Sequence, residues 1–512
     1  MSASAIEAFD DADQEPAYTG SAPVLPYPFA RAHGAVLRRQ GDGLVQCVHR
    51  PALSLDAFLE IQRVAGSDLS LLEVEESEFE KVMGQEYRNS ATEAAEEAAA
   101  ADTDLAALAD SAAAVDDLLD QRNDAPVVRL INALLLEAVK EGASDIHIET
   151  HERRLAVRFR VDGVLRKMIE PKRSLAPLLV SRIKVMARLD IAEKRLPQDG
   201  RVSLRVGDHE VDVRVSTIPS QYGERVVMRL LDRDATRPGC DAIGMGERDQ
   251  AVFERMLRRP EGILLVTGPT GSGKTTTLYA ALGDLNDNVR NIMTVEDPIE
   301  YTMEGIGQTQ VNPRTDLTFA RGLRAILRQD PDVIMVGEIR DGETAQVAVQ
   351  ASMTGHLVLS TLHTNSAIGS VTRLIDMGVE RFLLAPMLTG LIAQRLGRTL
   401  CAECRVPDRA SAIDRDLLGG KIEIGAPLFR PLGCPACFGN GYRGRTGIYE
   451  VVEIDSEREA LIHNGVAEAE LVEAARRKGP SLLEDGARKV AAGLTSVEEV
   501  TRVSQAEAAP GV

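Results

Sequence analysis

The chain has 512 residues, enough for roughly two to four domains, and at 44% hydrophobic residues it can fill several cores. Its formal net charge of −19 argues against a general nucleic-acid binder, whose contact surface is usually basic. The sequence has no run of about 18 apolar residues, and its acidic N-terminus lacks the basic and apolar regions of a signal peptide. We therefore expect a cytoplasmic protein of several domains.

Residues 1–89 and 90–124 differ sharply in composition. The first range has the mixed composition of a small folded domain. Between Ala91 and Asp120 there are thirteen Ala and nine acidic residues, with no Lys, Arg, Gly or Pro. Ala favours helix, but the like charges repel one another and little surface can be buried. We expect residues 90–124 to form a tether, and the sequence leaves both a partly helical and a disordered state open.

Residues 125–236 predict a smaller α/β domain with an antiparallel sheet. The stretch "PVVRLINALLLEAVKEGA" has apolar residues at helical spacing and ends at Gly142. The next pattern, "RRLAVRFRVDGVLRKM", alternates apolar and basic residues before Asp162-Gly163, a pair typical of hairpin turns. A second stretch, "RVSLRVGDHEVDVRVST", repeats this arrangement. The polar faces of these strands should therefore be rich in arginine.

Residues 243–398 predict a parallel α/β sheet. Four short apolar runs, separated by stretches of helix length, read "GILLVT", "NIMTVED", "VIMVGE" and "HLVLSTL". Alternating strands and helices of this kind form sheets whose ligands bind beyond the carboxyl ends of the strands. Candidate site residues are therefore those that follow these four runs.

The first apolar run leads into a phosphate-binding loop. Residues Gly268 to Thr275 match the pattern G-x-x-x-x-G-K-[ST]. Glycines let the backbone N–H groups face phosphate oxygens, Lys274 would reach the β- and γ-phosphates, and the Thr275 hydroxyl would ligate Mg²⁺. The predicted nucleotide-binding residues are Gly268, Pro269, Thr270, Gly271, Ser272, Gly273, Lys274, Thr275 and Thr276.

Two glutamates follow strands of the same predicted sheet. Glu296 ends the run of "NIMTVED", and Glu338 follows the run of "DPDVIMVGEIRD" after one glycine. Either carboxylate can orient the attacking water or act near Mg²⁺, although a strand-end carboxylate can instead cap the next turn. We favour Glu296 as the general base and Glu338 as the acid on the metal side. The sequence alone does not separate the two roles.

Two histidines flank the last apolar run. His356 and His363 are seven residues apart in "TGHLVLSTLHTNSA". An odd offset along a strand places two side chains on opposite faces, so we do not expect these histidines to share a metal ion. His363 follows the carboxyl end of the strand, where it would contact the γ-phosphate or the catalytic carboxylate. We predict a functional role for His363 and leave His356 undecided.

Arginines are candidates for stabilising the transition state. Hydrolysis builds charge on the γ-phosphate, and arginines from a neighbouring domain or subunit can neutralise it. A single arginine is more often a surface or ion-pairing residue. We select Arg201 and Arg214; the other candidates are Arg195, Arg225, Arg229, Arg321, Arg324 and Arg328.

Four cysteines form two C-x₂-C pairs with 29 residues between them: Cys401, Cys404, Cys434 and Cys437. Two such pairs in a cytosolic chain are typical of a structural Zn²⁺ site, here in a segment over residues 399–442. Thioredoxin-like redox chemistry would need only one pair on a suitable helix. Residues 443–512 predict short helices.

These motifs together resemble one known group, the secretion ATPase superfamily of type II secretion, type IV pilus and type IV secretion motors. The blocks "GPTGSGKTTT", "VEDPIEY", "ILRQDPDVIMVGEIRD" and "GHLVLSTLHTN" resemble its Walker A, Asp box, Walker B and His box. Its second N-terminal domain is similar to "SDIHIE", "VRFRVDGVL", "KRLPQDGR" and "GERVVMRLL". Its C-terminal metal element is similar to "AQRLGRTLC", the cysteine pairs and "GYRGRTGIYE".

The resemblance implies a fold, a reaction and partners. It implies a RecA-like P-loop ATPase domain, preceded by the smaller α/β domain and a small N-terminal domain and followed by a zinc-binding element. It implies hydrolysis of ATP with Mg²⁺ by a homohexamer, with arginines from a neighbouring subunit completing the site. Residues 1–89 would dock on the cytoplasmic domain of an inner-membrane secretion protein, and an inner-membrane platform protein would be a further partner. The chain would be peripheral at the inner membrane.

The subfamily follows from two features. The cysteine segment and the short first domain resemble type II secretion ATPases of the general secretory pathway protein E type, which power assembly of a pseudopilus. A type IV pilus assembly ATPase is the alternative. A nucleic-acid translocase is disfavoured by the acidic balance and the absence of Trp, so we expect no nucleic-acid partner.

Overall fold

A computed structural model describes residues 125–206, 209–232 and 239–504, shorter segments between residues 25 and 82, and residue 105. The chain divides into two compact units, Met1–Val161 with Leu165–Asp232, and Asp162–Val164 with Arg233–Val512. The predicted tether therefore lies outside the described residues apart from Leu105. In the described part of the chain, none of the helices combines the length and hydropathy needed to cross a membrane.

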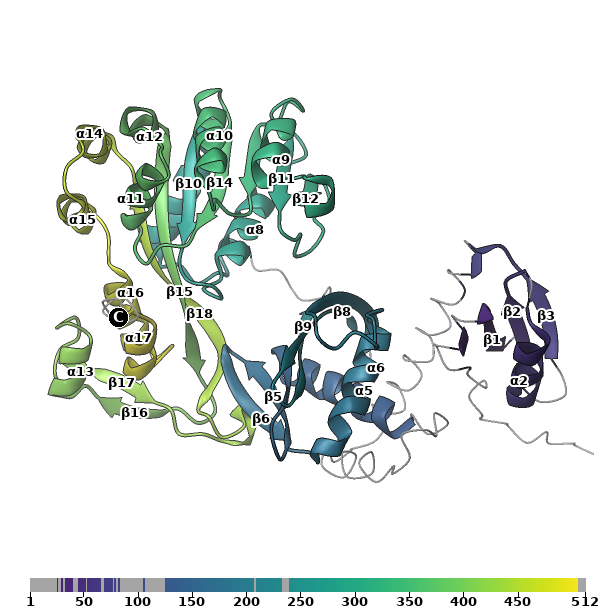
Figure 1. Cartoon of the computed structure of the whole chain (residues 1–512). Helices are drawn as coiled ribbons and strands as arrows, with labels where there is room; N and C mark the ends of the chain where they lie inside the picture. The colour runs from purple at the N-terminus through teal and green to yellow at the C-terminus, as the bar shows by residue number, and fades with distance from the viewer. Residues whose placement is uncertain are drawn as a thin grey trace, which may run out of the picture. The chain divides into compact units, whose positions relative to one another are not determined.

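The described residues of the first segment include a three-stranded sheet and helix α2 (Figure 1). Strand β1 pairs antiparallel with β2, and β2 pairs in parallel with β3. A parallel pair needs a crossover connection, and helix α2 supplies it with Ile61 packed into the core. The elements are β1 (Ala35–Arg39), β2 (Val45–His49), α2 (Leu55–Ala65) and β3 (Leu69–Glu73).

The next domain is an α/β fold with an antiparallel sheet of strand order β6-β5-β4-β9-β8-β7. Alternate residues of β8 are buried, whereas β4 is buried along nearly its whole length, and buried residues of every strand pack with α5 and α6 into one core. The turn between β5 and β6 has positive φ at both Asp162 and Gly163, as the sequence pair predicts. Its elements are α5 (Ala125–Lys140), β4 (Ala143–Thr150), β5 (Leu155–Val161), β6 (Val164–Ile169), η2 (Arg173–Leu175), α6 (Ala176–Met186), β7 (Gln198–Val206), β8 (His209–Ser220) and β9 (Gly223–Asp232).

The second unit contains a seven-stranded sheet of order β12-β11-β13-β14-β10-β15-β18, here called the sheet of the P-loop domain. All neighbours are parallel except β15 and β18. The four apolar runs of the sequence form β10, β11, β13 and β14. The elements are α7 (Glu247–Leu257), β10 (Gly262–Thr267), α8 (Lys274–Leu285), β11 (Ile292–Glu296), β12 (Ile306–Gln310), η3 (Pro313–Thr315), α9 (Phe319–Ile326), β13 (Val333–Val336), α10 (Gly342–Met353), β14 (Leu357–Leu362), α11 (Gly369–Asp376), α12 (Arg381–Met387), β15 (Leu388–Leu400) and β18 (Tyr442–Glu453).

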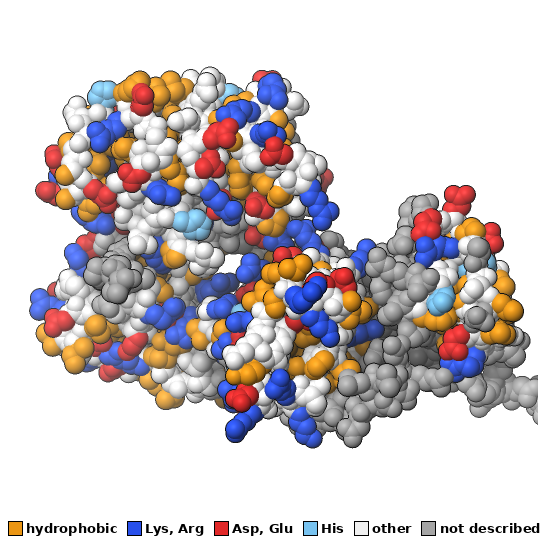
Figure 2. Space-filling view, viewed as in Figure 1, with side chains coloured by type: hydrophobic (Ala, Val, Ile, Leu, Met, Phe, Trp, Pro, Cys, Tyr) orange, Lys and Arg blue, Asp and Glu red, His pale blue; other side chains and the backbone are white. Residues whose placement is uncertain are grey.

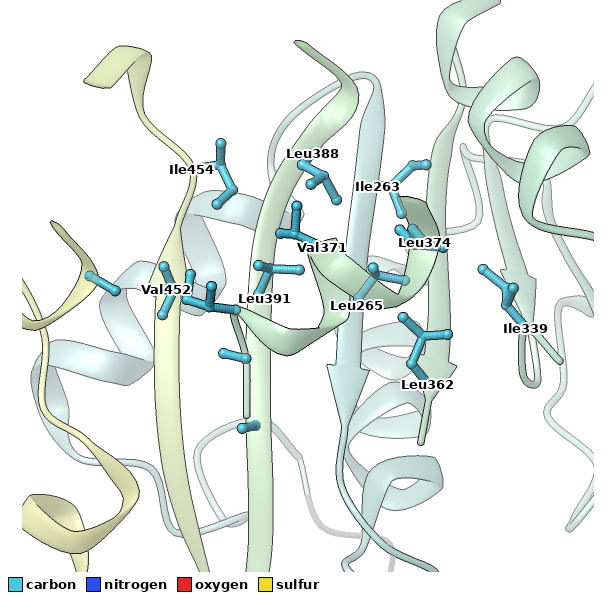
Figure 3. Close-up of a cluster of buried hydrophobic side chains, with 14 of the residues drawn as sticks. Ile263, Leu265, Ile339, Leu362, Val371, Leu374, Leu388, Leu391, Val452 and Ile454 are labelled. Atoms are coloured by element: carbon cyan, nitrogen blue, oxygen red, sulfur yellow. The ribbon is translucent and has the colours of Figure 1, made fainter. Parts of the chain in front are cut away.

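Both faces of this sheet are buried. Ile263 and Leu265 of β10 belong to one core, with α9 to α12, whereas Leu264 and Val266 belong to another, with α7 and α8. Figure 3 shows Ile263 and Leu265 on the side of the sheet that α11 covers, with Val371 and Leu374 of α11 in the same core. Burial on both faces explains why β10 reads as a continuous apolar run rather than an alternating one.

The C-terminal part departs in one respect from the expectation of short helices for residues 443–512. Strand β18 comes first and pairs with β15, because Ile448, Val451 and Val452 are buried in the cores of the sheet. Helices follow only after it. The remaining elements are β16 (Val406–Arg409), α13 (Ala412–Leu417), β17 (Pro427–Arg430), η4 (Pro435–Cys437), α14 (Ser456–Asn464), α15 (Glu468–Arg476), α16 (Leu482–Ala491) and α17 (Val497–Ser504).

Charged side chains of both signs share the surface. On the face in view in Figure 2, Lys and Arg side chains are interspersed with Asp and Glu. Exposed pairs such as Arg324–Glu343 at 2.6 Å and Arg255–Glu453 at 2.7 Å are of this kind. Pairs at such exposure stabilise a fold by at most about 1 kcal/mol each, so the two cores of the sheet dominate the stability of this domain.

Candidate functional site

The loop between β10 and α8 has the backbone that its glycines predict. Gly268 has a φ of 147° and Gly273 a φ of 87°, in the region that side chains disfavour. A Cβ at Gly268 would collide with the Gln394 carbonyl oxygen, and one at Gly273 would lie 2.8 Å from Gln394 Nε2. Both positions therefore need glycine for conformation and for space.

Helix α8 begins at Lys274 without a side-chain cap, because its N-cap residue is Gly273. The first N–H groups of a helix have no partner within the helix, and the helix dipole attracts negative charge to this end. Ser272 is buried, and its hydroxyl has no hydrogen-bond partner among the described residues. Pro269, Thr270, Thr275 and Thr276 are exposed. The loop therefore presents free donors of the kind that bind phosphate.

Lys274 is buried at the start of α8. Its Nζ donates hydrogen bonds to the carbonyl oxygens of Gly268, at 2.7 Å, and Pro269, at 3.1 Å. Burial lowers the pKa of Lys274 to about 8, with the Arg395 charge acting in the same direction and the Glu338 charge opposing it. The ammonium is therefore held close to the loop, and a phosphate anion would relieve its poor solvation.

Glu338 and His363 meet at the carboxyl ends of neighbouring strands. Glu338 follows β13 and His363 follows β14, and these strands are parallel. His363 Nε2 lies 3.2 Å from Glu338 Oε2, and Arg340 pairs with the other carboxylate oxygen. The strand that leads into the loop, β10, is the other neighbour of β14, and Thr267 at its end contacts Thr364, the residue after His363. The loop, the glutamate and the histidine therefore lie at the same edge of the sheet.

Glu296 lies in a separate buried cluster. Its carboxylate accepts hydrogen bonds from the Tyr279 hydroxyl, from Thr294 Oγ1 at 2.5 Å and from Gln308 Nε2 at 3.2 Å. Only 3% of Glu296 is exposed. Burial, together with the hydrogen bond to Glu296, raises the pKa of Tyr279. Three donors use most of the acceptor positions of this carboxylate, so less of it is available to a water than in an unpaired carboxylate.

Arg201 and Arg214 lie on the polar face of the antiparallel sheet. Arg201 on β7 is in register with Arg214 on β8, and Arg214 is in register with Arg229 on β9. Arg229 Nε lies 3.0 Å from Asp145 Oδ1, and Arg160 Nε lies 3.6 Å from Asp145 Oδ2. This sheet thus carries a row of arginines with an acidic residue near one end, as its alternating basic pattern indicates.

Several residues of the site escaped the sequence analysis. Tyr279 could have been noticed, since a tyrosine hydroxyl on an apolar helix face needs a polar partner when buried. Gln308 and Arg340 belong to no sequence motif or periodic pattern that would have singled them out. Arg395 occurs within "AQRLGRTLC", but nothing in the sequence places it beside Gly268. His356, which the sequence left undecided, has its Nδ1 within 2.8 Å of the Ala351 carbonyl oxygen, a local contact.

The four cysteines converge on one point. Their sulfur atoms all lie within 4.8 Å of one another, and none forms a disulfide. Distances between sulfurs are 3.9 Å for Cys401–Cys434, 3.7 Å for Cys404–Cys437 and 3.8 Å for Cys434–Cys437. Four thiolates about 2.3 Å from one tetrahedral Zn²⁺ would be about 3.8 Å apart, whereas disulfide sulfurs are about 2.05 Å apart.

Backbone groups around the cysteines support the same donor set. The N–H groups of Gly433 and Gly441 donate to the sulfurs of Cys404, at 3.3 Å, and Cys437, at 3.2 Å. Hydrogen bonds of this kind stabilise thiolates and orient them toward a metal. The residues therefore fit a closed Cys₄ site of the structural type.

Comparison with known proteins decides the family. The sequence model of the family described as "Type II/IV secretion system protein" matches residues 120–502. The chain belongs to this family. A second family model, which describes an N-terminal domain of "GSPII protein E", matches residues 24–87. The resemblance to type II secretion ATPases of the protein E type is thereby confirmed.

Curated members of this secretion family match nearly the whole chain. Type II secretion system protein E of Pseudomonas aeruginosa is 59% identical over 488 residues, covering 94% of this chain and 96% of that protein. Type II secretion system ATPase E of Vibrio cholerae is 55% identical over 485 residues, covering 94% and 96%. These alignments span nearly the full length of both proteins in each case.

The fold is shared with a solved ATPase. The crystal structure of the ATPase DotB of Legionella pneumophila aligns with a TM-score of 0.55 at 22% identity, covering 73% of this chain and 94% of that one. The expected RecA-like fold class is thereby confirmed for this member of the family.

Proposed function

We propose that this chain hydrolyses ATP in its P-loop domain and uses the energy to power protein export by a type II secretion system. The observation that carries the proposal is the site formed by Lys274, Glu338 and His363 at one edge of the sheet. The named relatives support the coupling to type II secretion, and the match of residues 24–87 to the N-terminal domain of protein E favours it over type IV pilus assembly.

Binding of ATP would replace interactions that Lys274 now makes within the loop. The Lys274 ammonium exchanges the carbonyl oxygens of Gly268 and Pro269 for β- and γ-phosphate oxygens. The Ser272 hydroxyl and the N–H groups at the start of α8 add donors. The exposed Thr275 hydroxyl would hold Mg²⁺, which when bound neutralises charge on the phosphates.

We assign the general base to Glu338, although the sequence alone favoured Glu296. One oxygen of Glu338 lies beside His363, and the charge of Glu338 raises the pKa of Lys274. We therefore place Glu338 at the edge of the sheet where the phosphates would bind. Glu296 already accepts three hydrogen bonds from Tyr279, Thr294 and Gln308. Glu296 would instead have a structural role, fixing the positions of these three residues. His363 would orient Glu338 or contact the γ-phosphate.

The finer features of the family complete the proposal. A homohexamer would place Arg201 and Arg214 of one subunit at the nucleotide of another. Residues 1–89 would dock on the cytoplasmic domain of an inner-membrane secretion protein, and an inner-membrane platform protein would receive the force for pseudopilus assembly. The chain would work in the cytoplasm, peripheral to the inner membrane. Zn²⁺ held by Cys401, Cys404, Cys434 and Cys437 would stabilise its C-terminal element.

One comparison tests the proposal. ATP hydrolysis by the full-length protein and export into the culture medium are measured for the wild type, for Lys274→Ala and for the surface control Lys421→Ala. Lys421 pairs with Glu484 on the surface, so its loss should leave both activities intact. Lys274→Ala should abolish both. Export at the wild-type level by Lys274→Ala would exclude the proposal that ATP hydrolysis in this domain drives export. A wild-type protein that does not hydrolyse ATP would exclude the proposed ATPase activity.

A further inference from the structure

Arg395 is a buried cation that crosses over the start of the phosphate loop. It lies on β15, next to β10, and only 3% of it is exposed. A Cβ added to Gly268 would lie 3.2 Å from Arg395 Nη1. The guanidinium therefore passes directly over the residue at which β10 becomes the loop.

The guanidinium connects its own strand, β15, to the segment after β14 through backbone oxygens. Nη1 donates to the Gln394 carbonyl oxygen at 3.1 Å, and Nη2 donates to the Asn365 carbonyl oxygen at 2.8 Å. Asn365 comes two residues after His363. Arg395 therefore reaches from β15, past the phosphate loop, to the segment that carries the histidine of the site.

Thr267 holds the same segment from the other strand. Its hydroxyl, at the end of β10, contacts the Thr364 carbonyl oxygen at 3.1 Å and Thr364 Oγ1 at 2.7 Å, and it accepts from the Thr364 N–H at 2.9 Å. Thr267 is fully buried. The segment after His363 is thus held by two residues that lie next to Gly268: Thr267, which precedes it in the chain, and Arg395 on β15.

A buried guanidinium is costly in free energy, and hydrogen bonds or opposite charges must offset that cost. Removing a charge from water carries a large penalty, and apolar residues of similar volume often stabilise a core as well or better. Here the charge also lies beside a second buried cation, Lys274, whose pKa it lowers. The Glu338 charge offsets this repulsion at Lys274 in part, and a bound phosphate would offset more of it. The position of Arg395 is therefore explained by the phosphate site better than by packing.

We infer that Arg395 is a positioning residue of the nucleotide site, which fixes the segment carrying His363, and through it Glu338, against the phosphate loop. The inference rests on the proposed hydrolysis of ATP. Lys274 serves binding, whereas Glu338 and His363 serve the chemical step. Arg395 connects the two groups, so its loss should slow the chemical step more than it weakens binding.

The test compares three variants of the full-length protein. Arg395→Gln removes both the charge and the fork of donors, and Arg395→Lys keeps the charge but not the fork. Arg398→Gln is the matched control. Arg398 lies three residues further along β15, and its Nη2 pairs with Glu499 at 2.8 Å, away from the loop. ATP turnover is measured as kcat and KM, and folding as Tm.

Arg395→Gln should lower kcat about 100-fold, as a displacement of catalytic groups by about 1 Å can do, with KM changed less than about threefold. Arg398→Gln should keep a wild-type kcat even where its Tm falls. The inference is overturned if Arg395→Gln keeps the wild-type kcat, or if KM rises while kcat is unchanged. A wild type without ATP turnover would count against the proposed function itself, not against the role of Arg395.

A pH profile separates positioning from general damage to the fold. Lys274 is faced by two charged groups, with Arg395 lowering its pKa and Glu338 raising it. Removing the Arg395 charge should move the alkaline limb of ATP binding, measured with a fluorescent ATP analogue, to higher pH. Arg398→Gln should leave the limb in place, and an unmoved limb in Arg395→Gln contradicts the inference.

Arg395→Lys tests the positioning role of Arg395 even if Arg395→Gln does not fold. It retains a buried cation, so its alkaline limb should match that of the wild type. Without the two parallel donors it should still lose about tenfold in kcat, because a lysine cannot reproduce the fork of a guanidinium. A wild-type kcat in Arg395→Lys would show that the hydrogen bond to Asn365 does not position the site.

Discussion

His363 Nε2 lies 3.2 Å from Glu338 Oε2 across two parallel strands, although 25 residues separate the two side chains. The contact exists because β13 and β14 are neighbours with Val336 in register with Ser360, so the residues that follow them meet. Arg340 holds the second carboxylate oxygen. Glu338 is therefore oriented by two cationic or polar partners at the edge where phosphate would bind.

The first prediction separates the two glutamates. Glu338→Gln removes the proposed base and should lower kcat by about 10²- to 10⁴-fold with little change in Tm. Glu296→Gln should instead cost about 1–3 kcal/mol of stability, because its amide N–H₂ would replace one carboxylate oxygen and face either the Tyr279 hydroxyl or the donors of Thr294 and Gln308. Turnover and thermal unfolding of both variants check this.

Asp341→Asn offers a control for the first prediction. Asp341 follows the same strand but caps α10, accepting from the Thr344 N–H at 2.8 Å. It should affect stability slightly and turnover hardly at all. If turnover is lost in Glu296→Gln and kept in Glu338→Gln, the general base is Glu296 and not Glu338.

The second prediction concerns two loop glycines. Gly268→Ala should abolish ATP binding and destabilise the domain, since the new methyl group would collide with the Gln394 carbonyl oxygen. Gly271 also has a positive φ of 81°, but a Cβ there meets nothing within 4 Å. Gly271→Ala should therefore cost only the conformational strain of about 1–2 kcal/mol. Equal losses of ATP affinity in both would contradict the role of Gln394 in shaping the loop.

Local patterns predicted the P-loop domain well because each carries its own physical meaning. Buried parallel strands such as Gly262–Thr267 need continuous apolar runs, and the loop needs its glycines and Lys274 at fixed spacing. The Asp162-Gly163 turn likewise follows from the conformations that a two-residue hairpin requires. In these cases the information lies within a few consecutive residues.

What could not be predicted depends on contacts between distant segments. The base role of Glu296 stays a prediction, made because the residue ends a strand; its hydrogen bonds to Tyr279 and Gln308 could not be predicted, since no spacing connects these residues to it. Strand β18 was missed for a similar reason, since it is an edge strand added by pairing with β15. Arg395 acts at Gly268 only because β15 lies beside β10. These contacts are set by the tertiary fold and not by any local sequence pattern.

The third prediction concerns the cysteine cluster. The purified protein should contain about one Zn²⁺ per chain, and Cys404→Ser should lose the metal and lower Tm, because the element would lose the bonds that close it. Cys47→Ser removes an isolated buried thiol and should keep the metal. Metal analysis and thermal unfolding decide the matter. Metal-free protein with a wild-type Tm would exclude a structural zinc site.

The fourth prediction follows from the lowered pKa of Lys274. The pKa is about 8 in the folded protein and 10.5 for a free lysine. Between these values the unfolded chain binds more protons than the folded one, so Lys274 makes the protein more stable as pH rises. Below about pH 8 both states carry the charge and the full cost of burying it remains.

Lys274→Met has no such titration, so it measures the effect directly. In the absence of nucleotide, Lys274→Met should be more stable than the wild type at neutral pH, and this difference should shrink as pH rises from about 8 toward 10.5. Denaturation midpoints of both proteins across this range give the difference. A difference that stays constant would show that Lys274 titrates like an exposed lysine, because only a pKa that differs between the folded and unfolded chains makes stability depend on pH.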